Sequence, residues 1–152
     1  MKKLLLLTLI LAIISVTLVK TADVDAEDAK YEFYIPTNYY IETDDVMKVE
    51  RLGTFDIVTC EKKDMEKVKA KIGKTLGYTV RFSGDKSAVD SLLSEYGVVI
   101  RERQKIDGVE IIYGYSNRLS GGVELNGKKV NVQINYKSNA IAMGTPLIMG
   151  SY

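Results

Sequence analysis

The chain has 152 residues, 46% of them hydrophobic, and its 21 basic and 20 acidic side chains leave a formal net charge of +1 at pH 7. This balance lacks the basic excess of polyanion-binding proteins, so we expect no nucleic-acid partner. The sequence has no histidine and one cysteine, Cys60. The commonest general base, the commonest transition-metal ligand and any internal disulfide are therefore missing, and we predict no cofactor or metal site.

Residues 1–26 have the pattern of a secretory signal peptide. A basic start, Met1-Lys2-Lys3, precedes an apolar run from Leu4 to Val19, which is shorter than the roughly 20 residues of a membrane-spanning helix. Small residues favour cleavage after Val24-Asp25-Ala26 over cleavage after Val19-Lys20-Thr21, and an uncleaved anchor is the alternative. We therefore predict a secreted or extracytoplasmic protein, which contacts a membrane only through this segment if the segment is retained.

Residues 27–45 are predicted to form an acidic and aromatic leader before a single folded domain over residues 46–152. The acidic residues from Asp23 to Asp28 are typical of a solvated segment. Pro36 lies within the aromatic stretch from Tyr31 to Ile41, which favours an interrupted edge strand. A stacking surface for carbohydrate or peptide is the alternative interpretation of these aromatic residues.

Two amphipathic helices are predicted within the domain. The first has an apolar stripe that ends before Gly77, and the second begins near Asp85 and ends at Gly97. Short strands are expected around Phe55 and over residues 78–82. The inward side chains of the helices are Met65, Val68, Ile72 and Leu76 in the first, and Val89, Leu92, Leu93 and Tyr96 in the second.

The strongest local signal is Asn126-Gly127, which favours a type I′ hairpin turn and pairs Val123 with Val130 and Glu124 with Lys129. Asp107-Gly108 predicts a second hairpin, and a short strand is expected over residues 147–149. We expect consecutive antiparallel strands from Val109 onward, with one apolar face. Because such a face must be covered, the sequence predicts an α+β fold, in which a mainly antiparallel, curved sheet is covered on one face by two helices.

Candidate reactive groups are few. Cys60 is interpreted as a buried small side chain, and a Ser–Lys pair of Ser116 or Ser120 with Lys128 carries no known spacing signature. Alternating amides on one strand are consistent with a polar recognition strip, but a solvent-facing sheet side is the simpler and favoured interpretation. The candidate binding residues are Tyr113, Tyr115, Ser116, Asn131, Gln133 and Asn135.

Several short motifs resemble the YwmB family of exported proteins from Gram-positive spore-formers. They are Tyr-Gly-Tyr-Ser at residues 113–116, residues 127–133, Gly-Thr-Pro-Leu-Ile at residues 144–148, and Tyr152. The resemblance covers residues 78–152 and implies a fold similar to the TATA-box-binding protein and a role in spore-forming cells. Family members are longer at the N-terminus, and the family assigns no catalytic residues.

We therefore expect a non-enzymatic binding or interaction module of the cell envelope, with an envelope protein or glycan as its partner. The alternative is a small envelope hydrolase or transferase that uses an unrecognised Ser or Cys. An enzyme should show a concave pocket with a perturbed titrating group, whereas a binding module should present tyrosines and amides on a sheet face.

Overall fold

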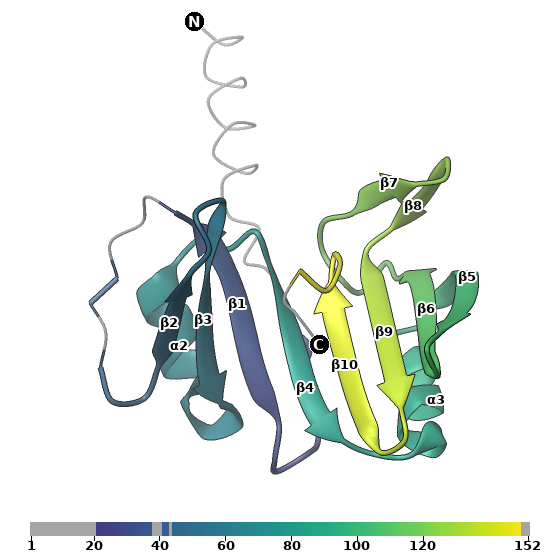
Figure 1. Cartoon of the computed structure of the whole chain (residues 1–152), viewed down its shortest axis with the longest axis horizontal. Coiled ribbons are helices and arrows are strands. Elements are labelled where there is room, and N and C mark those ends of the chain that lie inside the picture. Colours follow the sequence, from purple (N-terminus) through teal and green to yellow (C-terminus); the bar gives the residue numbers. More distant parts are fainter. Residues whose placement is uncertain (1–20, 38–40, 43, 150–152) are drawn as a thin grey trace, which may run out of the picture.

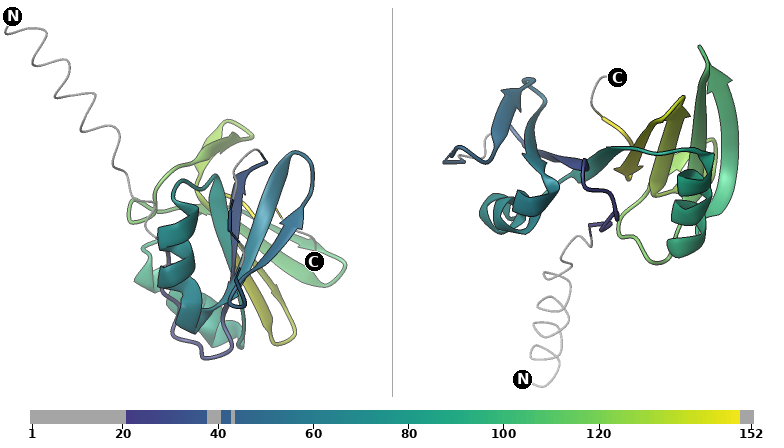
Figure 2. Two further views of the ribbon diagram at one scale, coloured as in Figure 1. Left: turned by 90° about the vertical axis from the view of Figure 1, so that its left-hand side faces the viewer. Right: turned by 90° about the horizontal axis from the view of Figure 1, so that it is seen from below.

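The structure is a computed structural model, and it describes residues 21–37, 41–42 and 44–149. An eight-stranded antiparallel sheet with the strand order β2-β3-β1-β4-β10-β9-β6-β5 dominates it (Figure 1). Both helices lie on one face of the sheet, behind it in Figure 1, and the outer strands bend away from them in the right panel of Figure 2. The predicted α+β class, with a mainly antiparallel sheet and two helices, is confirmed.

The strands of this sheet are β1 (Lys30–Pro36), β2 (Lys48–Arg51), β3 (Phe55–Glu61), β4 (Gly77–Ser83), β5 (Val99–Ile106), β6 (Val109–Tyr115), β9 (Val132–Lys137) and β10 (Ala140–Thr145). A separate two-stranded sheet contains β7 (Val123–Leu125) and β8 (Lys128–Val130). The helices are α2 (Met65–Ile72), which follows the 3-10 turn η1 (Lys62–Asp64), and α3 (Lys86–Glu95).

Strand β1 differs from the leader and the edge strand expected for residues 27–45. It lies inside the sheet, hydrogen-bonded to β3 on one side and to β4 on the other. Tyr31, Phe33 and Ile35 are buried on the helix side. Pro36 is the last residue of the strand, where it ends the ladder instead of interrupting it. The apolar alternation before Pro36 therefore belongs to a buried strand, and Pro36 marks its end.

Helix α2 is shorter than predicted. It ends at Gly73, whose φ of 63° is left-handed, and Gly77 begins β4 instead of closing the helix. Met65, Val68 and Ile72 are buried as expected, but Leu76 lies beyond the helix and is 46% exposed. Gly73 therefore ends the helix about one turn before Gly77, where the apolar stripe predicts the end.

Helix α3 agrees with the prediction at both ends. The side chain of Asp85 accepts a hydrogen bond from the Ala88 amide at 3.1 Å, which caps the first turn. Gly97 adopts a left-handed φ of 56° just after the helix. Val89 and Leu92 are buried against the sheet.

Both predicted hairpins form. Asn126 and Gly127 have φ of 51° and 72°, and Val123 pairs with Val130 as expected. The consecutive order of the strands was wrong, however, because β9 pairs with β6 and the β7–β8 hairpin forms its own sheet. The final strand also differs, since β10 covers Ala140–Thr145 and residues 147–149 form no strand.

The core lies between the helices and the helix-facing side of the sheet. Val68 of α2 and Leu92 of α3 belong to the same buried cluster as Val132 and Ile134 of β9, and Val130 is also buried. Among the described residues, no helix lies on the opposite side of the sheet (Figure 2). We refer to this second side as the open face.

Candidate functional site

The middle of the open face has a low floor along β10. Ala140, Ala142 and Gly144 alternate on this side of the strand, because alternate residues of a strand share a face. Ala142 pairs with Arg81 of β4 on one side and with Asn135 of β9 on the other. Small side chains between longer ones leave a trough that runs along the strand.

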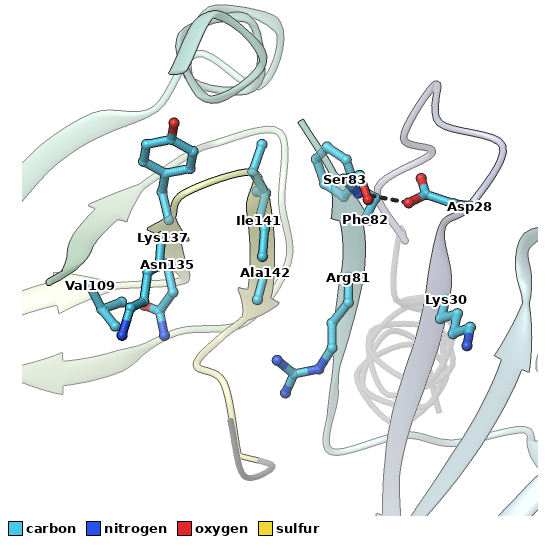
Figure 3. A pocket seen from close by; sticks show the side chains of 12 residues that line it. Asp28, Lys30, Arg81, Phe82, Ser83, Val109, Asn135, Lys137, Ile141 and Ala142 are labelled. Atoms are coloured by element: carbon cyan, nitrogen blue, oxygen red, sulfur yellow. Dashed lines mark hydrogen bonds between the residues drawn. The ribbon is translucent and has the colours of Figure 1, made fainter. Parts of the chain in front are cut away.

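This trough forms a groove of about 510 Å³, which we call the β10 groove. Figure 3 shows Asn135 and Val109 on one side of Ala142, and Arg81 and Lys30 on the other. The open-face residues that line the groove are Lys30, Arg81, Ser83, Val109, Asn135, Lys137, Ala140 and Ala142, and Asp28 lies at its end.

Cationic side chains dominate both rims of the groove. The Nε atom of Arg81 lies 2.8 Å from Oε1 of Glu32, and this ion pair holds the guanidinium in place. The other oxygen of Glu32, Oε2, is buried without a hydrogen-bond partner among the described residues. Lys30 is exposed on the same side, and Lys137 donates to the Asp107 carbonyl at 3.1 Å on the other. The lining therefore combines three cations with the single carboxylate of Asp28.

Asp28 stays ionised at neutral pH. The side chain and the backbone amide of Ser83 donate hydrogen bonds to its carboxylate, which lowers the pKa of Asp28. One of these bonds joins the Ser83 amide to Oδ2 of Asp28 at 2.9 Å (Figure 3). The end of the groove thus carries a fixed negative charge beside the cations.

Further along the same face, towards the end of β10, amide groups are joined by hydrogen bonds. The Nε2 atom of Gln133 donates to Oδ1 of Asn135 at 3.0 Å, and Oε1 of Gln133 accepts from the Ile148 amide at 3.2 Å. The Met149 amide donates to the Tyr34 hydroxyl at 3.2 Å. A Cβ atom on Gly144 would lie 2.6 Å from Cγ1 of Ile148, so residues 147–149 cross directly above that glycine.

The six predicted binding residues separate into two groups. Gln133 and Asn135 lie on the open face beside the groove, and Tyr113 pairs with Gln133 on the neighbouring strand. Tyr115 is half-buried, and the Lys129 ammonium lies 5.4 Å from the centre of its ring. Gln133 and Asn135 are only 6% and 3% exposed, and the amide of Gln133 is bonded to Asn135 and to the Ile148 amide. Tyr113 and Tyr115 are therefore the partly exposed members of the predicted set.

Ser116 and Asn131 belong to the framework instead of the predicted recognition strip. Both are fully buried. Asn131 accepts a hydrogen bond from the Ser116 amide at 2.8 Å and donates to the carbonyls of Ser116 and Leu119 at 2.7 and 3.0 Å. The side chain of Asn131 thus gives main-chain groups of the loop after β6 the hydrogen bonds that a neighbouring strand would otherwise provide.

The candidate nucleophiles also have structural surroundings. The Ser116 hydroxyl hydrogen-bonds the Tyr96 carbonyl and accepts from the Arg118 amide at 3.0 Å. Lys128 donates to the Arg101 carbonyl at 3.3 Å. The Ser120 hydroxyl is buried and has no hydrogen-bond partner among the described residues. None of these contacts joins a serine hydroxyl to Lys128.

Cys60 is expected to react slowly. It is 4% exposed, and burial, followed by the nearby charge of Asp64, raises the pKa of its thiol to about 11. At pH 8 about one thiol in a thousand would be ionised, against about a quarter for an ordinary cysteine. We expect alkylation by iodoacetamide, followed by mass spectrometry, to be at least about a hundredfold slower in the native protein than in denaturant. Rapid labelling of the folded protein would contradict this burial.

Sequence reasoning missed the cations of the groove. Arg81 interrupts the apolar strand Gly77–Ser83 and Glu32 interrupts the aromatic strand Lys30–Pro36, so each could have been noticed as a charge within a buried segment. Their pairing could not, because it depends on β1 lying beside β4. Lys30 and Lys137 look like ordinary surface lysines in the sequence.

The described part of the chain holds no cluster of three or more His, Cys, Asp or Glu side chains that could bind a metal ion. Within the same residues, no helix combines the length and the apolar character needed to cross a membrane. Comparisons with protein-family models, with curated proteins and with solved structures find no match. The geometry of the open face is therefore the feature that bears on function.

Proposed function

We propose that this protein is an extracytoplasmic, non-enzymatic binding module, and that its β10 groove holds an anionic glycan of the cell envelope. The observation that carries the proposal is the groove itself, with its floor of Ala140 and Ala142 and cations on both rims. Its volume of about 510 Å³ falls within the range of roughly 300–1,000 Å³ that ligand sites occupy. Export and the resemblance to the YwmB family stay predictions.

The chemistry of the groove favours a saccharide over a peptide strand. β10 is hydrogen-bonded to β4 and β9 along its length, so a ligand above it meets side chains instead of free backbone groups. Peptides that add to a sheet need an open strand edge. The lining includes the amide of Asn135 and the hydroxyl of Ser83, and such neutral polar groups suit the hydroxyl groups of sugars.

The charge of the groove favours an acidic saccharide. Lys30, Arg81 and Lys137 attract carboxylate or phosphate groups, and Arg81 is oriented by Glu32 before any ligand arrives. Asp28 at one end disfavours a ligand charge there, which would orient a charged chain along the groove. The candidate nucleophiles Ser116, Ser120 and Cys60 lie outside this lining, which favours binding over covalent catalysis.

The proposal can be tested by calorimetric titration with two probes of equal length, tetragalacturonate and maltotetraose. We expect the acidic probe to bind more tightly than the neutral one. The double variant Lys30→Gln/Lys137→Gln is expected to weaken binding of tetragalacturonate about tenfold, because two exposed charge contacts contribute about 1–1.5 kcal/mol together.

The matched control is the variant Lys74→Gln/Lys105→Gln, which removes the same charge from exposed positions outside the β10 groove. It should retain the affinity of the parent at equal ionic strength. Equal losses in both double variants would indicate a nonspecific charge effect. If neither probe binds, an acidic glycan is contradicted as the ligand.

A further inference from the structure

Residues 22–29, which precede β1, lie over the core with three buried apolar side chains, and we call them the N-terminal strap. Ala22, Val24 and Ala29 are 1%, 4% and 1% exposed. All three belong to the same apolar cluster as the helices and the sheet. The acidic side chains of this segment are exposed, as the sequence predicts for a solvated leader. The small apolar side chains between them are buried.

Tyrosine hydroxyl groups fasten the strap to the core. The Ala22 amide donates to the Tyr78 hydroxyl at 2.7 Å, and the Ala22 carbonyl accepts from the Tyr31 hydroxyl at 3.0 Å. The Tyr31 hydroxyl also accepts from the Val24 amide at 3.3 Å, and the Tyr96 hydroxyl donates to the Asp23 carbonyl at 3.2 Å. These hydroxyl groups lie within the core and need such partners.

A charged side chain fastens the same segment at its outer side. Nζ of Lys62 donates to the Val24 carbonyl at 2.6 Å and lies 3.7 Å from Oδ1 of Asp23. Main-chain groups of Ala22, Asp23 and Val24 are thus all engaged by side chains from elsewhere in the fold. The first three residues of the strap are therefore held at several points.

Both cleavage sites that the sequence offers conflict with this strap. A cut after Ala26 would remove Ala22 and Val24 and leave the hydroxyls of three core tyrosines without these partners. A cut after Thr21 would convert the Ala22 amide, in a residue that is 1% exposed, into a charged ammonium group beside the Tyr78 hydroxyl. Burial of such a charge without a partner is costly.

We propose that the working form of this protein keeps its N-terminal apolar segment, which tethers the domain to a lipid bilayer. The tether goes beyond the proposed function, and the experiments below test it separately from export. The sequence supplies an apolar run from Leu4 to Val19 between Lys2-Lys3 and Lys20. Lysines at both ends of a short apolar run can extend their ammonium groups to the two headgroup regions, which suits a run slightly shorter than the bilayer.

The test is expression of the full chain with a C-terminal tag in a secreting bacterial host, followed by an alkaline carbonate wash of the membranes and an intact-mass measurement. We expect the protein to stay in the washed membrane pellet with residues 1–26 still attached. A soluble product that begins at Ala22 or at Glu27 would overturn the tether.

Protease treatment of intact cells separates this inference from the proposed location. Digestion of a membrane-bound domain from outside supports both the tether and export. A membrane-bound domain that is protected until the cells are lysed supports the tether and contradicts an extracytoplasmic site. The second result would refute the proposed function without refuting retention of the segment.

A full-chain variant tests the structural reason for retention. Tyr78→Phe leaves the buried Ala22 amide without its acceptor, and we expect it to lower the melting temperature of the detergent-solubilised protein by about 5–10 °C. Tyr115→Phe is the matched control, because the side chain of Tyr115 lies on the open face, and it should melt as the parent does. Equal melting temperatures for all three proteins would overturn the argument from the strap.

Discussion

Replacement of Asn131 by alanine is expected to lower the free energy of unfolding by about 3 kcal/mol, because buried backbone groups lose their partners. Asn131 is fully buried and makes three hydrogen bonds, to the amide and carbonyl of Ser116 and to the carbonyl of Leu119. Alanine leaves one amide and two carbonyls unpaired in the interior. Urea denaturation, followed by far-ultraviolet circular dichroism, measures the change.

The matched control for this variant is Asn117→Ala, which removes the same amide group from an exposed position in the neighbouring turn. It should change the stability by less than about 0.5 kcal/mol. A small effect at Asn131 would return that residue to the open recognition strip that its sequence pattern indicates. The result therefore decides between a structural role and a ligand-binding role for this side chain.

Replacement of Phe33 by alanine should be the most damaging single change, with a loss of about 3–5 kcal/mol. Phe33 is 1% exposed in the interior strand β1. Its ring centroid lies 6.2 Å from that of Tyr31 and 6.4 Å from that of Tyr78. The same urea denaturation experiment tests this value.

Phe55→Ala provides the comparison for the same side-chain deletion on the open face. Phe55 is half-buried, with its ring centroid 5.7 Å from that of Tyr34, and its loss should cost about 1–2 kcal/mol. If residues 27–45 formed a solvated leader, Phe33→Ala would have no effect. A loss at Phe33 no larger than that at Phe55 would contradict an interior position for β1.

Local patterns in the sequence determined most of the individual elements. The apolar stripes predicted both helices, and Asn126-Gly127 and Asp107-Gly108 predicted both hairpin turns, which have left-handed φ values at all four residues. These signals succeed because helix periodicity and turn chemistry depend on residues that are close in the chain. The α+β class followed, since one apolar sheet face requires a cover.

Only the tertiary structure decided which strands are neighbours, and with that the site. The floor of the groove exists because β10 lies between β4 and β9, and Arg81 is oriented because β1 lies beside β4. Such pairings join segments that are distant in the chain, and no local signal specifies them. The buried strap before β1 was hidden for the same reason, because Ala22 and Val24 become core residues only where the fold brings Tyr31, Tyr78 and Tyr96 around them.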